Sequence, residues 1–341
     1  MPAKKAGKRM RPAAGRHGGT RRTAKRSVTA LGGSAATSTV TATHCSPARY
    51  ENALKTGTCL TAPEVHEVAS QLGISTGSAS VGASSSGFDP AALMSRLHDR
   101  LGTRPGEEEK WISAPEVARQ PRLSQRLSAA FRPESPQEWV RNPNFWLSNL
   151  DIEAVMRQYE EHLGPTKGFR FLGVFPRDFA SPPDRGRQGS CVSNVICQLH
   201  VTDLLAEGRQ HLGCILNLDK HTGTGSHWTS VYVGLNPLQP HRFGFLYYDS
   251  VGRRMPAETK AFADRLKREV TDAMGPEAGA AFAAGTKHNT VRKQFLDTEC
   301  GIYAMFFIVA CVQTDLPFEQ ICRDVMRHDR DMHRLRSVFF R

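Results

Sequence analysis

The amino-acid sequence predicts an α+β protein with a central mixed or antiparallel sheet flanked by helices. Short runs rich in β-branched and aromatic residues follow one another at 214–218, 227–233 and 243–249, separated by turn-forming residues. Helix-like segments lie on both sides of these runs, at 145–162 and 255–271. Strands preceded and followed by helices favour helix layers packed on a sheet.

The positive charge of the chain is concentrated in residues 1–50. This segment holds eleven Lys or Arg and no Asp or Glu, which leaves 34 basic and 33 acidic residues among the other 291. It also lacks hydrophobic periodicity, so we expect a disordered basic arm. Two uses of the arm stay open: DNA binding through basic residues 4–26, or a nuclear-localisation patch within 21–26.

Residues 51–140 predict a helical accessory region. A Thr-x-x-Glu capping box begins a helix at 59–73, and leucines four residues apart indicate another helix at 90–101. Between the two helices, residues 73–87 are mostly Gly, Ser and Ala, a composition typical of a flexible linker. We expect this region to pack against the rest of the chain or to bind a partner.

Residues 141–341 predict the main folded domain. A strand that ends at a proline is expected at 169–176, and a polar loop at 185–189. A short strand is expected at 290–295. After the buried helix that starts at Cys300, two more helices are expected, at 318–326 and 331–340.

The eight cysteines are scattered through the chain and form no Cys-x-x-Cys pair. This usage indicates reduced thiols in a cytosolic setting rather than a disulfide framework. Cys191, Cys197 and His200 are the only close set of zinc-ligand types, and their spacing fits no usual zinc pattern, so we expect no metal and no cofactor. Neither a membrane span nor a secretory signal is expected, because no long apolar run is present.

Cys300 is the candidate nucleophile. It opens a stretch, 300–309, that is apolar almost all round and therefore indicates a buried helix. The first turn of a helix offers free N–H groups and the positive end of the helix dipole, which favour the reactive thiolate. Gly301 lets a substrate or another backbone approach the sulfur closely. The alternative is a buried cysteine that acts as a small inert hydrophobe.

Three further side chains complete a candidate site with Cys300. His227 begins one predicted strand and Asp249 ends the next, so the two side chains lie at one sheet rim if these strands are antiparallel neighbours. Such a pair provides a general base and the carboxylate that orients it. Gln294 can donate its amide to a developing oxyanion. Each residue also has an ordinary structural reading: a strand-edge histidine, a turn-forming aspartate and a surface glutamine.

The sequence resembles the SUMO-protease-like and adenain-like cysteine peptidases, above all the branch from nucleocytoplasmic large DNA viruses. The resemblance covers residues 140–341 well and 50–140 loosely, and the basic arm lies outside it. It rests on His227-Trp228, Tyr248-Asp249-Ser250, Gln294, Glu299-Cys300-Gly301, Trp146-Leu147-Ser148, 213–217, 222–225, Cys59-Leu60 and 331–341.

This resemblance implies a papain-like catalytic core with a helical amino-terminal extension. It also implies the roles of nucleophile for Cys300, base for His227, orienting carboxylate for Asp249 and oxyanion donor for Gln294. Trp228 would wall a narrow channel that admits only glycine, and Gly301 would lie beside the bound substrate. Glu299 stands where cellular members commonly have Asp, a difference that we expect to bear little on the chemistry.

The implied activity is a viral thiol endopeptidase that cleaves structural polyproteins of the capsid or core after Gly-Gly during virion maturation. The implied location is the virion and the assembly sites in the host cytoplasm. Two alternatives stay open: an isopeptidase that removes a ubiquitin-like modifier, and a nucleic-acid-binding structural protein with a protease-like body. The intact set of four site residues argues against the second alternative.

Overall fold

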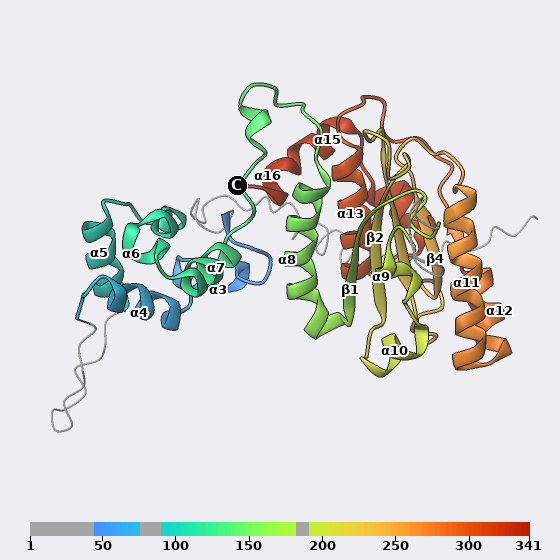
Figure 1. The fold of residues 1–341 in the computed structure, drawn as a ribbon, viewed down its shortest axis with the longest axis horizontal. Helices are drawn as coiled ribbons and strands as arrows, with labels where there is room; N and C mark the ends of the chain where they lie inside the picture. The colour runs from blue at the N-terminus through green and yellow to red at the C-terminus, as the bar shows by residue number, and fades with distance from the viewer. Residues whose placement is uncertain (1–43, 76–89, 182–190) are drawn as a thin grey trace, which may run out of the picture.

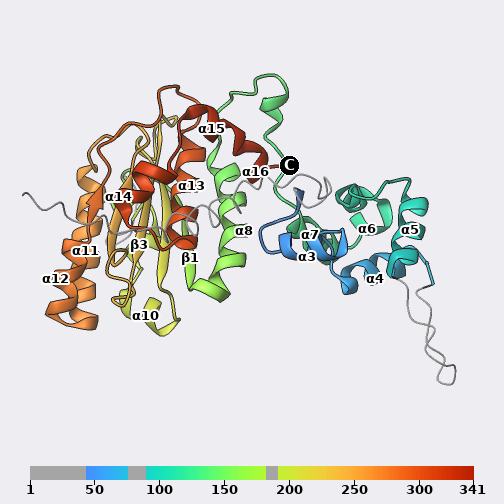
Figure 2. The ribbon, with the colours of Figure 1, turned by 180° about the vertical axis from the view of Figure 1, so that it is seen from behind.

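The computed structural model describes residues 44–75, 90–181 and 191–341. Most of the predicted arm (1–50) and linker (73–87) lies outside these residues, as does the predicted loop at 185–189. In Figure 1 a sheet with helices on both faces lies beside a separate group of short helices, α3 to α7. Seen from behind in Figure 2, the helices that follow α13 in the sequence gather on the same side of the sheet as α13 itself.

The sheet has five strands, arranged in the order in which they occur in the sequence. β1 runs parallel to β2, the pairs β2–β3 and β3–β4 are antiparallel, and β4–β5 is parallel. This arrangement confirms the predicted α+β class with a mixed sheet. The strands are β1 (Phe169–Pro176), β2 (His211–Asn217), β3 (Trp228–Gly234), β4 (Gly244–Tyr248) and β5 (Lys287–His288).

Side chains alternate between two apolar cores, one on each face of the sheet. Along β3, Tyr232 points into one core while Val231 and Val233 point into the other. The first core is completed mainly by α8 (Asn149–Lys167) and α13 (Cys300–Gln313), and the second by α11 (Ala257–Met274) and α12 (Pro276–Ala284) together with the short helices α9 (Asn194–Cys197) and α10 (Val201–Ala206).

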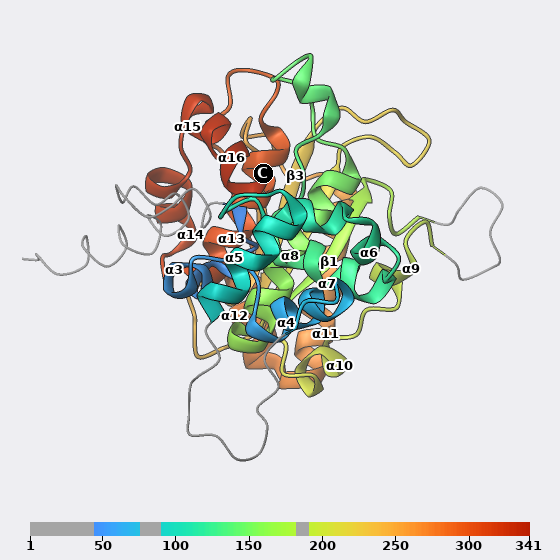
Figure 3. The same ribbon diagram turned by 90° about the vertical axis from the view of Figure 1, so that its left-hand side faces the viewer.

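The amino-terminal helices enclose a third apolar core, centred on Trp111, which is fully buried. Cys45 belongs to this core and forms an isolated bridge with Phe131, so the folded part of this region begins ahead of residue 51. Figure 3 shows the group lying in front of α8. Its helices are α3 (Tyr50–Thr56), α4 (Ala62–Gln71), α5 (Pro90–Leu101), α6 (Pro115–Ala118) and α7 (Pro121–Ala130).

Several elements differ from their predicted form. Residues 290–295 are irregular. The backbone N–H groups of Lys293 and Gln294 both donate to the carbonyl of Ser250 instead of pairing along a strand. The predicted helix at 318–326 starts as α14 (Phe318–Gln320) and continues as a π-helical turn (Ile321–Val325). The predicted helix at 331–340 is divided into α15 (Asp329–Arg334) and α16 (Arg336–Phe339). Among the described residues, no helix has both the length and the apolar character that crossing a membrane would need.

The expectation that all the cysteines are reduced is wrong for four of them. Disulfides join Cys45 to Cys59 and Cys191 to Cys197, and their Cα atoms are 5.2 and 6.4 Å apart, within the range that a disulfide spans. Sequence spacing did not reveal these pairs, because the fold brings each of them together. The other four cysteines are free and buried.

Denatured, unreduced protein should therefore contain four titratable free thiols rather than eight, which a thiol-reactive chromophore in guanidinium would count.

The Cys45–Cys59 bridge closes a loop with a sequence separation of 14. Replacing both cysteines by Ser should lower the free energy of unfolding by about 3 kcal/mol through the larger entropy of the unfolded chain. A count of eight thiols, or an unchanged free energy of unfolding, would contradict this expectation.

Candidate active site

His227 and Asp249 meet at one rim of the sheet. β3 and β4 are antiparallel neighbours, with Ser230 opposite Tyr248, so the residue that precedes β3 lies beside the residue that follows β4. His227 Nε2 is 2.7 Å from Asp249 Oδ1. This bond leaves Nδ1 of the ring available to the thiol. The structure thus brings together the two residues that the strand ends indicated.

Asp249 is fully buried and held by several partners. Its Oδ1 also accepts a hydrogen bond from the Val251 amide at 2.8 Å. The Asn289 side chain forms two hydrogen bonds with the backbone of Asp249. It accepts from the Asp249 N–H at 2.8 Å and donates to the Asp249 carbonyl at 2.7 Å. Asn289 was not identified from the sequence, because it lies 40 residues away and only the folded chain shows the contact.

Cys300 is the first residue of α13, and its side chain lines the same groove as His227. Burial disfavours a charged His227 ring, but hydrogen bonds to Asp249 and Cys300, together with their charges, outweigh burial and raise the pKa of His227 to about 9. The ring is therefore protonated at neutral pH. A cation next to the sulfur stabilises negative charge on it.

Gln294 lies next to the Asp249 turn and is buried. The Ser250 hydroxyl donates to Gln294 Oε1 at 2.6 Å, and the Gln294 N–H donates to the Ser250 carbonyl at 2.9 Å. With its carbonyl oxygen engaged in this way, the side-chain amide presents its NH₂ group away from Ser250. Ser250 therefore orients the side chain that the sequence indicated as an oxyanion donor, although Gln294 does not line the groove that contains Cys300.

Trp228 and Gly301 meet at Leu147. The Trp228 indole N–H donates to the Leu147 carbonyl at 3.0 Å. A Cβ atom on Gly301 would lie 3.1 Å from Leu147 Cδ1 and 3.4 Å from Trp228 Cδ1. A side chain here would therefore press on Leu147, so glycine lets the segment before α8 lie close against the Cys300 helix.

A groove of about 590 Å³ runs past the thiol. Aromatic side chains form part of its wall, with Phe145 46% and Trp146 43% exposed. Its far side is the turn between β2 and β3, where His221 Nδ1 lies 2.8 Å from Asp178 Oδ2 and ties this turn to the segment after β1. No motif in the sequence indicated the His221–Asp178 pair.

The zinc alternative is excluded for Cys191 and Cys197, because a disulfide joins them. Over residues 44–75, 90–181 and 191–341, no group of three or more His, Cys, Asp or Glu is arranged to hold a metal ion.

The sheet order brings Cys300, His227 and Asp249 to one rim of the sheet, which is the arrangement that a cysteine peptidase site needs. The catalytic-domain model of the Ulp1 protease family matches residues 211–337, which contain all four predicted site residues. This part of the chain is thus similar to the catalytic domain of the Ulp1 protease family, in line with the sequence resemblance.

Named relatives of the chain are viral thiol proteases. A thiol protease of Acanthamoeba polyphaga mimivirus is 27% identical over 223 residues, which are 63% of this chain and 62% of the relative. A cysteine protease of African swine fever virus is 28% identical over 129 residues, 38% of this chain and 43% of the relative. The matched parts are thus less than two thirds of either relative.

The crystal structure of the African swine fever virus protease shares the fold. The match covers 89% of this chain and 97% of that protease chain, with a TM-score of 0.53 and 18% sequence identity. The predicted papain-like arrangement is thus confirmed as the Ulp1-like protease fold.

Cys300 should be the free thiol that iodoacetamide modifies first in the native protein. Burial raises the pKa of Cys214 and of Cys311 to about 12 and also raises the pKa of Cys322, so these three remain protonated at pH 7. Peptide mass spectrometry after a brief exposure would identify the modified residue. The variant His227→Gln should slow modification at Cys300 about tenfold or more, because the neighbouring cation is lost. Equal labelling of all four free cysteines would contradict this assignment.

Proposed function

We propose that this chain is a thiol endopeptidase that cuts after Gly-Gly in viral structural polyproteins during virion maturation. The observation that carries the proposal is the arrangement of Cys300 with the His227–Asp249 pair beside a groove. The viral thiol proteases among its relatives support a viral role. Its proposed location, the virion and the assembly sites in the host cytoplasm, follows from that role.

In the proposed reaction, the Cys300 thiolate attacks the carbonyl carbon of the scissile peptide bond. The carbonyl oxygen becomes an oxyanion that accepts a hydrogen bond from the Gln294 amide. His227 donates its proton to the leaving amine, and a thioester forms. Neutral His227 then takes a proton from water as the water oxygen attacks the thioester carbonyl carbon. The carboxylic acid product leaves, and the Cys300 thiolate and the protonated ring are restored. Asp249 keeps the ring oriented throughout.

The preference for glycine is proposed from the shape of the groove. Trp146 and Trp228 both line it, and Trp228 lies directly after His227 in the sequence. Two indole rings beside a nucleophile restrict the space for substrate side chains, and glycine needs the least. An isopeptidase acting on a ubiquitin-like modifier would use the same groove, because such a modifier also ends in Gly-Gly. Cleavage of a modifier conjugate but not of a Gly-Gly-X peptide would favour that alternative.

Replacing Cys300 or His227 by Ala should abolish turnover of a fluorogenic Gly-Gly-X peptide. Gln294→Ala should lower kcat about 100- to 1,000-fold through the loss of one oxyanion donor. Lys260→Ala, on the exposed face of α11, is the control and should behave as wild type. Activity within tenfold of wild type in the Cys300 or His227 variant would remove the catalytic assignment.

Turnover should also fall at alkaline pH. Because the pKa of His227 is raised to about 9, the ring holds the proton that the leaving amine needs at pH 7 and loses it as the pH rises through about 9. The stability that the raised pKa contributes is full below about pH 6.5, the ordinary pKa of His, and is lost as the pH rises from there through about 9. Asp249→Asn removes one cause of the raised pKa, so the alkaline limb of kcat/KM should move to lower pH. An alkaline limb that does not move would contradict the proposed role of Asp249.

We also retain the proposal that basic residues 4–26 bind DNA. The charge of the arm supports it, since residues 1–50 hold eleven Lys or Arg and no acidic residue. Deleting residues 1–49 should weaken salt-sensitive retention on a DNA column, because released counterions drive such binding. Unchanged retention would count against it.

A further inference from the structure

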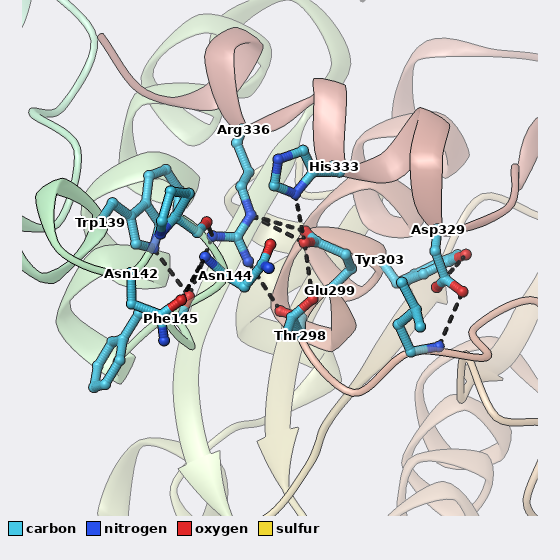
Figure 4. Close-up of polar contacts among 12 residues, drawn as sticks. Trp139, Asn142, Asn144, Phe145, Thr298, Glu299, Tyr303, Asp329, His333 and Arg336 are labelled. Carbon is cyan, nitrogen blue, oxygen red and sulfur yellow. Dashed lines mark hydrogen bonds and ion pairs between the residues drawn. The ribbon is translucent and has the colours of Figure 1, made fainter.

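A buried carboxylate directly precedes the nucleophile. Glu299 is 1% exposed, and both of its carboxylate oxygens accept from Arg336 Nε, at 3.1 and 3.0 Å. His333 Nδ1 lies 3.0 Å from one of them. Figure 4 shows these contacts converging on Glu299 from α15 and α16. From the sequence, Glu299 was expected to bear little on the chemistry. That expectation did not consider Arg336 as its partner.

Arg336 uses its remaining nitrogens on two other segments. Nη2 donates to the Thr298 carbonyl at 3.1 Å. Nη1 donates to the Pro143 carbonyl at 2.6 Å and to the Phe145 carbonyl at 3.2 Å. The guanidinium carbon also lies 4.3 Å from the centre of the Trp139 ring. One side chain thus links the residues just before Cys300 to the segment that leads into the wall of the groove.

Asp329 of α15 holds the other end of the same loop. Its Oδ2 accepts from the amides of Phe295 and Leu296, at 2.8 and 3.0 Å. These are the two residues that follow Gln294. Loop 294–300 is therefore fixed by a carboxylate next to the oxyanion donor and by a guanidinium next to the nucleophile. Both groups come from the segment 329–336, which Figure 4 shows crossing over the loop.

The energetics favour a role in geometry rather than in stability alone. Removing a buried ion pair from water costs about as much as the mutual attraction of the charges returns. A guanidinium with five hydrogen bonds to backbone and side-chain oxygens does, however, hold its partners in a single arrangement. Catalysis needs such an arrangement, because a displacement of about 1 Å can cost about 100-fold in rate.

We propose that Arg336 and Asp329 are positioning residues that hold Gln294 and Cys300 in register for one substrate carbonyl, with Arg336 also fixing the wall of the groove. The inference rests on the peptidase function proposed above. It assigns the segment 329–336 a part in the reaction, although this segment contributes no residue to the lining of the groove.

The test compares Asp329→Ala and Arg336→Lys with a matched control, Arg334→Lys. Arg334 lies on the same segment, but its side chain is 64% exposed and forms an ion pair with Asp331. Turnover of the Gly-Gly-X peptide would be measured well below the melting temperature of each variant. Asp329→Ala should lower kcat about tenfold with KM within about twofold, because the groove wall is untouched. Arg336→Lys should lower kcat and also raise KM. The control should match wild type.

Modification of Cys300 by iodoacetamide distinguishes a lost alignment of Gln294 with Cys300 from a loss of the fold. Neither substitution touches His227 or Asp249, so the modification rate and its pH dependence should stay at wild-type values while turnover falls. The inference is overturned if kcat and KM stay within twofold of wild type in both variants. It is also overturned if modification of Cys300 falls in parallel with turnover.

Amide hydrogen exchange gives a readout that does not need activity. Exchange at 293–301 should become faster in both variants, and exchange at 142–148 in Arg336→Lys only. A wild-type protein that cleaves no Gly-Gly-X peptide would defeat the proposed function, and the exchange pattern would still decide whether these two side chains hold the loop. Unchanged exchange at 293–301 would overturn the inference.

Discussion

The burial of α13 on every side is the constraint on which the rest of the structure depends. Thirteen of its fourteen residues are buried, so apolar neighbours must surround its whole circumference. The sheet covers one side, α8 another, and residues 318–340 the remainder, all within one apolar core. A close-packed helix of this kind cannot shift without opening voids. Its first residue, Cys300, therefore has a fixed position relative to the ends of β3 and β4.

The sequence predicted elements well where turn signals bound them. Strand 169–176 and helix 90–101 have the predicted limits, because a proline ends the first and another begins the second. The prediction failed at 290–295, where the apolar residues Val291 and Phe295 are exposed and the chain bonds to Ser250 and Asp329. Periodicity reports which face of a segment is apolar, but it does not report whether a neighbouring strand is present to pair with.

The candidate site shows the same difference between what sequence signals indicate and what only the fold brings together. The placement of His227, Asp249 and Cys300 at the ends of elements could be predicted, because the sequence indicates the direction of those elements. Their catalytic roles stay a prediction. Asn289 and Arg336 could not be predicted, because they act through contacts 40 and 37 residues distant in sequence and carry no motif of their own. The Cys45–Cys59 and Cys191–Cys197 disulfides were missed for the same reason: pairing depends on Cα separations that only the fold sets.

Asp249 and Glu299 are both buried carboxylates, but they have different partners. Asp249 is fully buried, and within the described residues its Oδ2 has no hydrogen-bond partner. A neutral His227 would leave this carboxylate without a counter-charge in a region of low dielectric, so the pair favours a protonated ring. Glu299 is buried as well, but Arg336 compensates its charge through hydrogen bonds to both carboxylate oxygens. Asp249 therefore raises the pKa of His227, whereas Glu299, directly before Cys300 in the sequence, is paired with Arg336.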